Sequence, residues 1–102
     1  MKRIFLCCSA GMSTSMLVKK MEKAASEREL AVEIAAIPMS GFDEAIKTYD
    51  VCLLGPQIKF KLTDFQKQAA ELNKKVAAID PMAYGMMKGD QVLDQALSLL
   101  EE

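Results

Sequence analysis

Residues 7–15 read Cys-Cys-Ser-Ala-Gly-Met-Ser-Thr-Ser, and this stretch decides how the rest of the chain is arranged. An apolar run from Ile4 to Cys8 leads into it, and a helical pattern that begins near Thr14 follows it. The pattern predicts a strand, a tight loop of small residues and the start of a helix. Backbone N–H groups converge in such a loop, and the helix N-terminus adds partial positive charge. The stretch therefore predicts an anion site with a cysteine at its mouth.

Cys8 is the candidate catalytic nucleophile, because it ends the predicted strand at the loop. Backbone N–H groups stabilise a thiolate, which is the nucleophilic form, and they can hold the oxygens of a phosphoryl group during transfer. This interpretation requires an accessible Cys8 sulfur and backbone amides that point toward it. The alternative is an ordinary strand–helix turn that contains Cys and Ser. The candidate phosphate-binding residues are those that follow the cysteine: Ser9, Ala10, Gly11, Met12, Ser13, Thr14 and Ser15.

The composition is that of an ordinary globular chain, and 102 residues predict one domain, residues 1–102. A formal net charge of −1 without a basic block argues against nucleic acid as the main partner. The apolar run near the N-terminus is too short for a signal peptide or a membrane span, so we expect a cytoplasmic chain without direct membrane insertion. Three cysteines predict reduced thiols. The chain has no histidine, and we expect neither a metal nor a cofactor.

Apolar runs alternate with stretches of helical spacing along the whole chain. Continuous apolar runs predict central strands that are buried on both faces, whereas Glu33 indicates an edge strand. The helix that begins at Leu62 is expected to bury Phe65, Ala69 and Leu72. The predicted strands are Arg3–Cys8, Val32–Ile37, Asp50–Gly55 and Val76–Ile79. The predicted helices are about Ser15–Arg28, Ser40–Lys47 and Leu62–Asn73, with a last helix opened by Gly89-Asp90 and Asp90 as its N-cap.

The alternation predicts an α/β fold with a single four-stranded parallel sheet and helices on both faces. With the first and third strands central, the strand order is 2-1-3-4, and the chain reverses direction across the sheet between these two strands. Open α/β sheets bind ligands at such a point, beyond the carboxyl ends of the strands. Cys8 falls there, so the motif and the predicted topology indicate the same site.

The loop and the predicted sheet resemble those of the low-molecular-weight protein tyrosine phosphatases. In that family a cysteine is followed by five residues, an arginine and then Ser or Thr. Here Thr14 stands where the arginine would be, which removes the strongest bidentate phosphate clamp. Asp80, beside Pro81, is only a weak candidate for the general acid. A phosphocysteine formed here would lack the groups that direct water at it, which suits a phosphate carrier.

Three segments together resemble a second family more closely. They are Cys8 to Ser15, then Leu53-Leu54-Gly55-Pro56-Gln57-Ile58, and then Ile79-Asp80 followed by Tyr84-Gly85. Their order and spacing resemble the IIB component of bacterial phosphotransferase sugar-transport systems, of the lactose and chitobiose/cellobiose type. The resemblance covers essentially the whole chain.

The resemblance implies a phosphotransferase component in which Cys8 accepts phosphate from a histidine of a phosphorylated IIA partner. The phosphate then passes to a disaccharide bound by the membrane IIC partner. The lack of histidine fits, because the donor imidazole then belongs to another chain. Cys7 departs from the family, in which an apolar residue other than cysteine commonly precedes the active cysteine. Successive strand residues point to opposite faces, so we expect Cys7, like Cys52, in the core.

Gln57 and Tyr84 follow the third and fourth predicted strands and are the possible rim of the site. Gln57 is expected either to hydrogen-bond the phosphoryl group or the loop, or to be an exposed loop residue. Tyr84 is expected either to shield the phosphocysteine or contact a partner, or to cover the last helix. Soft methionine side chains suit a surface that meets two partners, and the candidates are Met12, Met82, Met86 and Met87. At least one of Met86 and Met87 is expected in the core instead.

Three other functions stay open from the sequence. A cysteine phosphatase or arsenate-reductase-like enzyme would hydrolyse a phosphoester or reduce an oxyanion. A thiol-redox protein would cycle a Cys7–Cys8 disulfide, although adjacent cysteines form strained bridges. A non-catalytic interaction domain would tolerate the loss of Cys8. The residues do not choose between cellobiose, chitobiose and lactose-like sugars, and they specify neither oligomeric state nor partner affinity.

Overall fold

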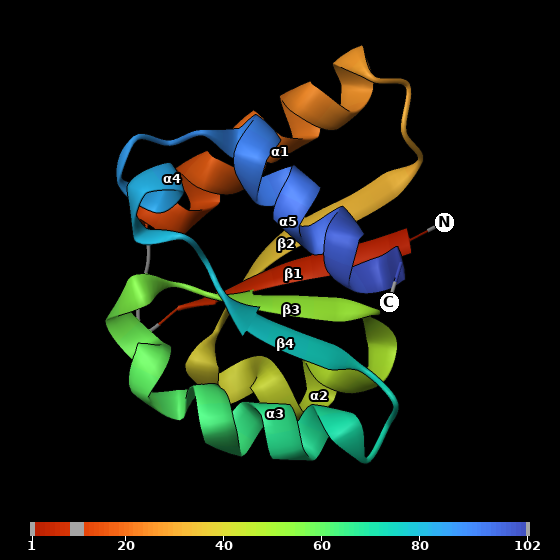
Figure 1. Cartoon of the computed structure of the whole chain (residues 1–102), viewed down its shortest axis with the longest axis vertical. Coiled ribbons are helices and arrows are strands. Elements are labelled where there is room, and N and C mark those ends of the chain that lie inside the picture. Colours follow the sequence, from red (N-terminus) through yellow and green to blue (C-terminus); the bar gives the residue numbers. More distant parts are fainter. Residues whose placement is uncertain (1, 9–11, 102) are drawn as a thin grey trace.

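The computed structural model of the chain describes residues 2–8 and 12–101, which form an α/β layered structure (Figure 1). The strands are β1 (Lys2–Cys8), β2 (Val32–Pro38), β3 (Val51–Leu54) and β4 (Lys75–Ala78). The α-helices are α1 (Met12–Glu27), α2 (Phe42–Thr48), α3 (Leu62–Ala70), α4 (Pro81–Gly85) and α5 (Gly89–Glu101). Two 3-10 helices, η1 (Met39–Gly41) and η2 (Pro56–Lys61), precede α2 and α3.

The four strands form one parallel sheet in the order β2-β1-β3-β4, as predicted. The central strands are the two with continuous apolar runs: all of β3 is buried, and so is β1 from Ile4 to Cys8. The registers align Cys7 with Leu54 on β3 and Cys8 with Pro38 on β2. The carboxyl ends of the central strands therefore meet at one edge of the sheet.

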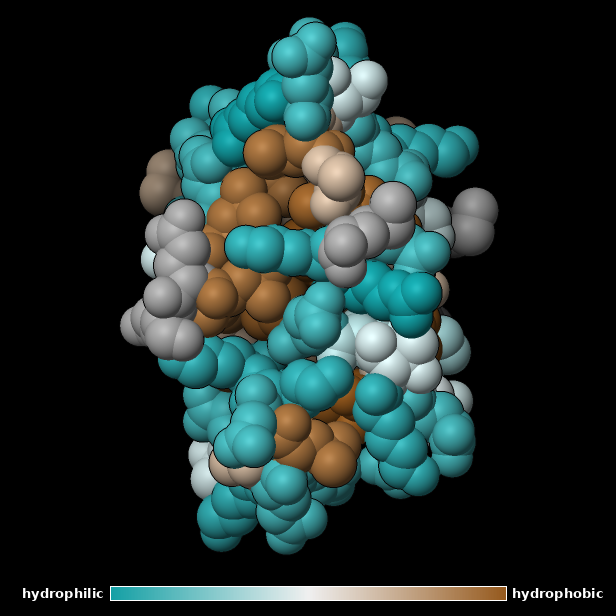
Figure 2. All heavy atoms as spheres, turned by 90° about the vertical axis from the view of Figure 1, so that its right-hand side faces the viewer, coloured by the Kyte–Doolittle hydropathy of each residue, from teal (hydrophilic) through white to brown (hydrophobic). Residues whose placement is uncertain are grey.

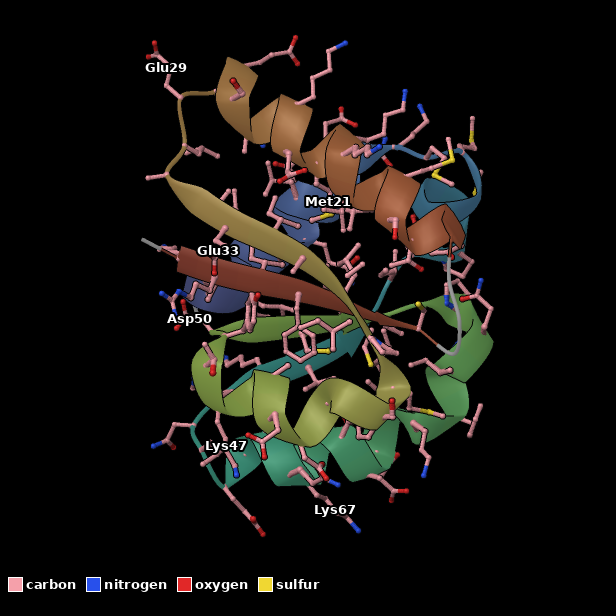
Figure 3. The ribbon with its side chains drawn as sticks, turned by 180° about the vertical axis from the view of Figure 1, so that it is seen from behind. Met21, Glu29, Glu33, Lys47, Asp50 and Lys67 are labelled. Carbon is pink, nitrogen blue, oxygen red and sulfur yellow. The ribbon has the colours of Figure 1, made fainter. Side chains whose placement is uncertain are left out.

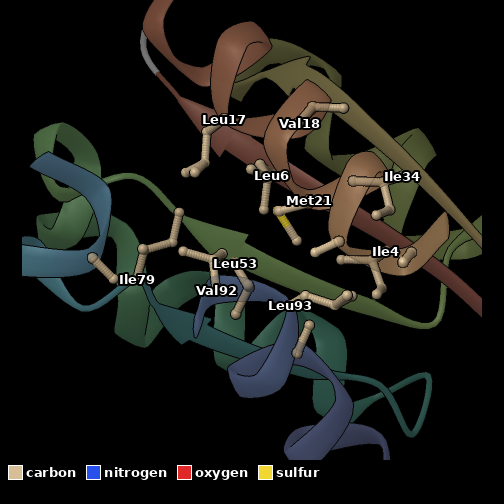
Figure 4. Packing of buried hydrophobic residues seen from close by; sticks show 14 of the residues in the cluster. Ile4, Leu6, Leu17, Val18, Met21, Ile34, Leu53, Ile79, Val92 and Leu93 are labelled. Carbon is tan, nitrogen blue, oxygen red and sulfur yellow. The ribbon is translucent and has the colours of Figure 1, made fainter. Parts of the chain in front are cut away.

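Helices cover both faces of the sheet and bury two separate cores. Helices α1, α4 and α5 lie on one face, and α2 and α3 lie on the other (Figure 1). Figure 4 shows the first core, where Met21 of α1 meets Leu6 of β1 and Leu93 of α5. In the second core the rings of Phe42 and Phe65 stack with centroids 3.8 Å apart. Alternate residues of β1 enter alternate cores, which sets the direction of each cysteine side chain.

Two expected helix boundaries are wrong. Helix α1 begins at Met12, three residues before the predicted Ser15, so Thr14 lies within its first turn. Helix α3 ends at Ala70 rather than Asn73, because Asn73 takes φ 59° and the N–H of Lys74 returns to the carbonyl of Ala69 at 2.8 Å. This C-terminal turn leaves Leu72 42% exposed, outside the buried face expected for it.

The segment between β4 and α5 contains a short helix that the sequence pattern did not predict. Pro81 occupies its first position and the Asp80 carboxylate accepts a hydrogen bond from the Met82 N–H, two features that start helices. Helix α5 then begins at Gly89, so Asp90 lies in its first turn rather than at its N-cap. Within residues 2–8 and 12–101, no helix has the length and apolarity needed to cross a membrane.

Candidate active site

Cys8 is the last residue of the central strand β1, at the edge of the sheet where the chain reverses direction. From β1 the chain passes through α1 to the outer strand β2, and from there through α2 to β3 on the other side of β1. The topological switch point predicted from the sequence is therefore present, with Cys8 at the carboxyl end of β1. Helix α1 begins four residues later, at Met12.

The expectation that Cys8 is open to solvent is wrong for this structure, because only 5% of its surface is exposed. The segment after β3 lies close against it. The N–H of Gly55 donates to the carbonyl of Cys7 at 2.8 Å, and a Cβ atom at Gly55 would lie 3.7 Å from the Cβ of Cys8. The end of β1 would meet such an atom at ordinary van der Waals distance, so among the nearest atoms only the Gln57 side-chain oxygen would have to move.

The candidate phosphate-binding residues fall into three groups. Ser9, Ala10 and Gly11 lie outside the described residues, and of Met12 and Ser13 only the backbone belongs to them, in the first turn of α1. Thr14 is fully buried, and Ser15 is exposed on the same helix. The described part of the stretch is thus the N-terminal turn of α1, which carries the partial positive charge of a helix end.

One hydroxyl group connects the predicted rim residues to this turn. The phenol oxygen of Tyr84 lies 3.2 Å from the hydroxyl oxygen of Thr14, and it accepts a hydrogen bond from the Gln57 side-chain amide at 3.0 Å. Tyr84 is 9% exposed, whereas Gln57 is exposed on η2. The segments that follow β1, β3 and β4 therefore meet at one point, as expected for residues after the carboxyl ends of parallel strands.

Gln57 also packs over Gly55, the residue that lies beside Cys8. Its side-chain oxygen lies only 2.7 Å from where a Cβ atom of Gly55 would be, and that same position is next to the Cβ of Cys8. The amide thus spans the space above Gly55, with its nitrogen bonded to Tyr84. The sequence placed Gln57 and Tyr84 at the rim but carried no signal for the hydrogen bond between them.

Cys7 and Cys52 lie together in the second core, on the face of the sheet opposite the first. Both are fully buried, and the neighbouring Cys52 thiol is the main cause that lowers the pKa of Cys7. Burial raises the pKa of the Cys52 thiol well above its ordinary value. All three cysteines are free thiols. The prediction that Cys7 and Cys52 are core residues is confirmed.

Exposed apolar side chains stand on the segments around this end of the sheet. Met82 and Met86, which the sequence singled out, are 71% and 61% exposed, whereas Met87 packs against the first core. Phe60, between Lys59 and Lys61, is 73% exposed and was not expected. Met16, 57% exposed on α1, was also missed, because its spacing alone does not separate the outer face from the inner one.

Asp80 caps α4, so its carboxylate is already engaged with the Met82 N–H. Thr14, at the position of the phosphatase arginine, is buried and uncharged. Among residues 2–8 and 12–101, no three His, Cys, Asp or Glu side chains converge as a metal site would require. Among the residues that the structure describes, Cys8, the first turn of α1, Gln57 and Tyr84 thus remain the candidates for chemistry.

Comparison with known proteins identifies a family whose model matches most of this chain. The model for "PTS system, Lactose/Cellobiose specific IIB subunit" matches residues 3–95. The oligo-beta-mannoside-specific EIIB component of Bacillus subtilis (strain 168) is 44% identical over 98% of this chain and 97% of its own length. The galactose-specific EIIB component of Lactococcus lactis subsp. cremoris (strain MG1363) is 41% identical over 97% of this chain and 96% of its own length.

A solved structure shares the fold. The lactose-specific IIB domain from Streptococcus pneumoniae superposes with a TM-score of 0.87, covers 96% of each chain and is 17% identical. A part of a longer protein is also similar: the lactose-specific EIICB component of Staphylococcus epidermidis matches 79% of this chain at 26% identity, over 14% of its own length. The family match over residues 3–95 includes the end of β1, the first turn of α1 and the segments that carry Gln57 and Tyr84.

Proposed function

This chain belongs to the lactose/cellobiose-specific IIB subunit family of the phosphotransferase system, and from this premise we propose that Cys8 carries the phosphoryl group. In this proposal residues 1–102 act as one carrier domain in sugar transport. The observation that carries the proposal is the position of Cys8 at the carboxyl end of β1, four residues before the N-terminus of α1. Helix N-termini and loop amides favour anions, so this position suits a phosphocysteine.

The proposed chemistry is two in-line displacements at phosphorus. The Cys8 thiolate attacks the phosphorus of a phosphohistidine on the IIA partner, the N–P bond breaks as the S–P bond forms, and the imidazole leaves. A sugar hydroxyl then attacks the same phosphorus in the IIC partner, the S–P bond breaks, and Cys8 returns to the thiolate while the hydroxyl proton goes to a base of that partner. Such transfers depend mainly on positioning and on stabilising the charge of the phosphoryl oxygens.

The two partners are proposed on separate grounds. This chain has no histidine, so a phosphohistidine donor belongs to another chain, which we take to be the phosphorylated IIA protein. A relative whose name joins IIC and IIB supports a membrane IIC acceptor. Relatives of nearly equal identity are named for an oligo-beta-mannoside and for galactose, so we assign the choice of sugar to IIC rather than to this chain.

The burial of Cys8 adds a condition to the proposal. With 5% of the residue exposed, a donor phosphorus does not reach the sulfur in this arrangement. We propose that docking of the partner displaces the groups that cover Cys8 before transfer. Gln57 is a candidate for such a group among the described residues, because its residue is exposed and its side-chain oxygen lies over Gly55, which packs beside Cys8.

The test is mass spectrometry of the protein after incubation with a phosphorylated IIA protein. We expect one phosphoryl group on the wild-type chain, none on Cys8→Ser and nearly wild-type labelling of Cys7→Ser. Equal loss in both variants would mean that the wrong thiol has been chosen. Rapid loss of the label to water, with turnover of p-nitrophenyl phosphate, would instead indicate a cysteine phosphatase.

A further inference from the structure

We infer that Tyr84 is a positioning residue for the proposed transfer, because its hydroxyl ties the first turn of α1 to the segment after β3. The inference rests on the proposed function of Cys8. It assigns Tyr84 a role in phosphoryl transfer, in addition to its packing as a buried residue. The distances that carry it are 3.2 Å from Tyr84 to Thr14 and 3.0 Å from Tyr84 to Gln57.

The Tyr84 hydroxyl has a well-defined position. Its ring belongs to the first core, and α4, which carries it, starts at Pro81 with the Asp80 carboxylate as its cap. The N–H of Tyr84 also donates to the carbonyl of Asp80 at 2.9 Å. A ring packed on a capped turn places its phenol oxygen without the freedom of a surface side chain.

Thr14 depends on this contact more than an exposed threonine would. It is fully buried, and a buried hydroxyl without a partner loses the hydrogen bonds it would make to water. Threonine is also a modest helix former, whereas here it lies in the first turn of α1. The tertiary bond from Tyr84 therefore favours an α1 that begins this early in the chain.

The start of α1 matters because its first N–H groups belong to the proposed phosphate site. Three residues separate Met12 from Cys8, so a shift of this turn moves the amides relative to the sulfur. Gln57 donates to the same oxygen, and its side-chain oxygen lies over Gly55, the residue that packs beside Cys8. Removal of the Tyr84 hydroxyl thus loosens two groups around the phosphorus, and reactions of this kind lose rate steeply when their groups are misplaced.

The experiment compares Tyr84→Phe with Tyr49→Phe. The chain has two tyrosines, and Tyr49 packs on Phe5 in the second core, with ring centroids 5.3 Å apart. Both variants lose a phenol hydroxyl, but only Tyr84→Phe loses it at the proposed site. Single-turnover transfer from a phosphorylated IIA protein to Cys8 is measured against donor concentration, at a temperature where circular dichroism shows both variants folded.

We expect Tyr84→Phe to lower the maximal transfer rate by about 10- to 100-fold with the half-saturating donor concentration unchanged, and Tyr49→Phe to transfer at the wild-type rate. A double-mutant cycle with Thr14→Val tests whether Thr14 and Tyr84 act together. If the two hydroxyls act through one hydrogen bond, removing both lowers the transfer rate no further than removing the Tyr84 hydroxyl alone. The Thr14→Val, Tyr84→Phe protein is therefore expected to transfer as slowly as Tyr84→Phe alone.

Several results would overturn the role of Tyr84. They are a wild-type maximal rate in Tyr84→Phe, equal losses in both tyrosine variants, fully additive losses in the cycle, or a change confined to the half-saturating concentration, which indicates docking. A wild-type protein that takes no phosphate on Cys8 would instead overturn the proposed function, and the inference with it.

Discussion

At the scale of single residues, two adjacent cysteines have opposite surroundings because a strand alternates its side chains. Cys7 enters the second core together with Cys52, whereas Cys8 ends β1 beside Gly55. The same alternation separates the two sulfurs across the sheet, which argues against a Cys7–Cys8 disulfide cycle. The departure of Cys7 from the family pattern is therefore a substitution in the core.

The raised pKa of Cys52 predicts how stability depends on pH. In the unfolded chain this thiol loses its proton near its ordinary pKa of 9.0, whereas burial keeps it protonated to higher pH in the folded chain. Above pH 9 the folded state therefore keeps a proton on Cys52 that the unfolded state has lost, and the contribution of this thiol to the free energy of unfolding falls as pH rises.

Urea denaturation at several pH values from 7 upward checks this expectation. Cys52→Ala is the control, because it lacks the thiol and is expected to lose less stability between neutral pH and pH 10 than the wild type does. Parallel curves for the two proteins would show that Cys52 does not contribute. Slow reaction of Cys52 with a thiol reagent in the folded protein is expected as well, since the neutral thiol is a poor nucleophile.

At the scale of elements, the segments after the strands shape the site. Helix α4 has five residues, too few for a clear hydrophobic period, yet it carries Tyr84 to the first turn of α1. Two side-chain amides bond to backbone carbonyls of the edge strand β4: Gln66 donates to the carbonyl of Val76, and Gln95 donates to that of Ala78. Such capping occupies carbonyls that would otherwise be open to another strand.

The contact between α1 and α5 predicts an asymmetric effect of two glycine substitutions. A Cβ atom at Gly89 would lie 2.4 Å from the backbone carbon of Lys20 on α1, whereas one at Gly85 would meet nothing within 4 Å. We expect Gly89→Ala to lower the free energy of unfolding by about 1–3 kcal/mol, because the helices must separate. Gly85→Ala, in α4, is expected to change it by no more than about 0.5 kcal/mol.

Urea denaturation of the two variants at pH 7 measures both values. Equal effects would mean that the approach of the two helices is not close enough to exclude a methyl group. A stabilised Gly89→Ala would contradict the packing outright, because the gain in helix propensity from glycine to alanine would then exceed any steric cost.

At the scale of the whole molecule, the amino end of the sheet carries charges of both signs, including the Arg3–Glu33 ion pair at 3.4 Å. Glu29, Glu33 and Asp50 lie at the amino end of the sheet, opposite Cys8 (Figure 3). The segments after β3 and β4 carry Lys59, Lys61 and Lys88, and their one acid, Asp80, is the α4 cap. A chain with a net charge of −1 thus presents positive charge at the proposed transfer site.

This placement predicts that association with a phosphorylated IIA protein slows as salt is added. Lysines at the docking end attract a partner that carries a phosphoryl group, and salt screens that attraction. Lys59→Gln with Lys61→Gln is expected to lower the association rate constant several-fold at low ionic strength and little at high ionic strength. Lys67→Gln, on α3 away from Cys8 (Figure 3), is the control and is expected to have little effect. Stopped-flow measurements in which all three proteins associate alike would contradict this prediction.

The opposite side of the molecule has exposed apolar areas among its polar side chains. Figure 2 shows brown side chains exposed on the side that carries both chain ends. Partly buried residues of the first core include Val32, Leu97 and Leu100, and Leu30 is 38% exposed. Exposed apolar residues also stand on the segments after β3 and β4, such as Phe60 on η2 and Met82 on α4.

The sequence by itself determined the strands, their order and the position of Cys8 at the switch point. These follow from local patterns: continuous apolar runs require burial on both faces, and parallel strands need helical crossovers. It also placed Gln57 and Tyr84 at the correct edge, because both follow strands whose carboxyl ends meet there. The direction of Cys7 into the core was equally predictable, since it depends only on the alternation of a strand.

Only the tertiary structure decided the early start of α1, the short helix α4, the burial of Cys8 and the bonds that join Thr14, Tyr84 and Gln57. Each of these depends on groups up to 70 residues apart in the chain that meet in space. Local propensity favours Thr14 as a cap and Gln57 as an exposed loop residue. Hydrogen bonds and packing between distant segments override such preferences, because their free energy exceeds the few tenths of a kcal/mol that separate local conformations.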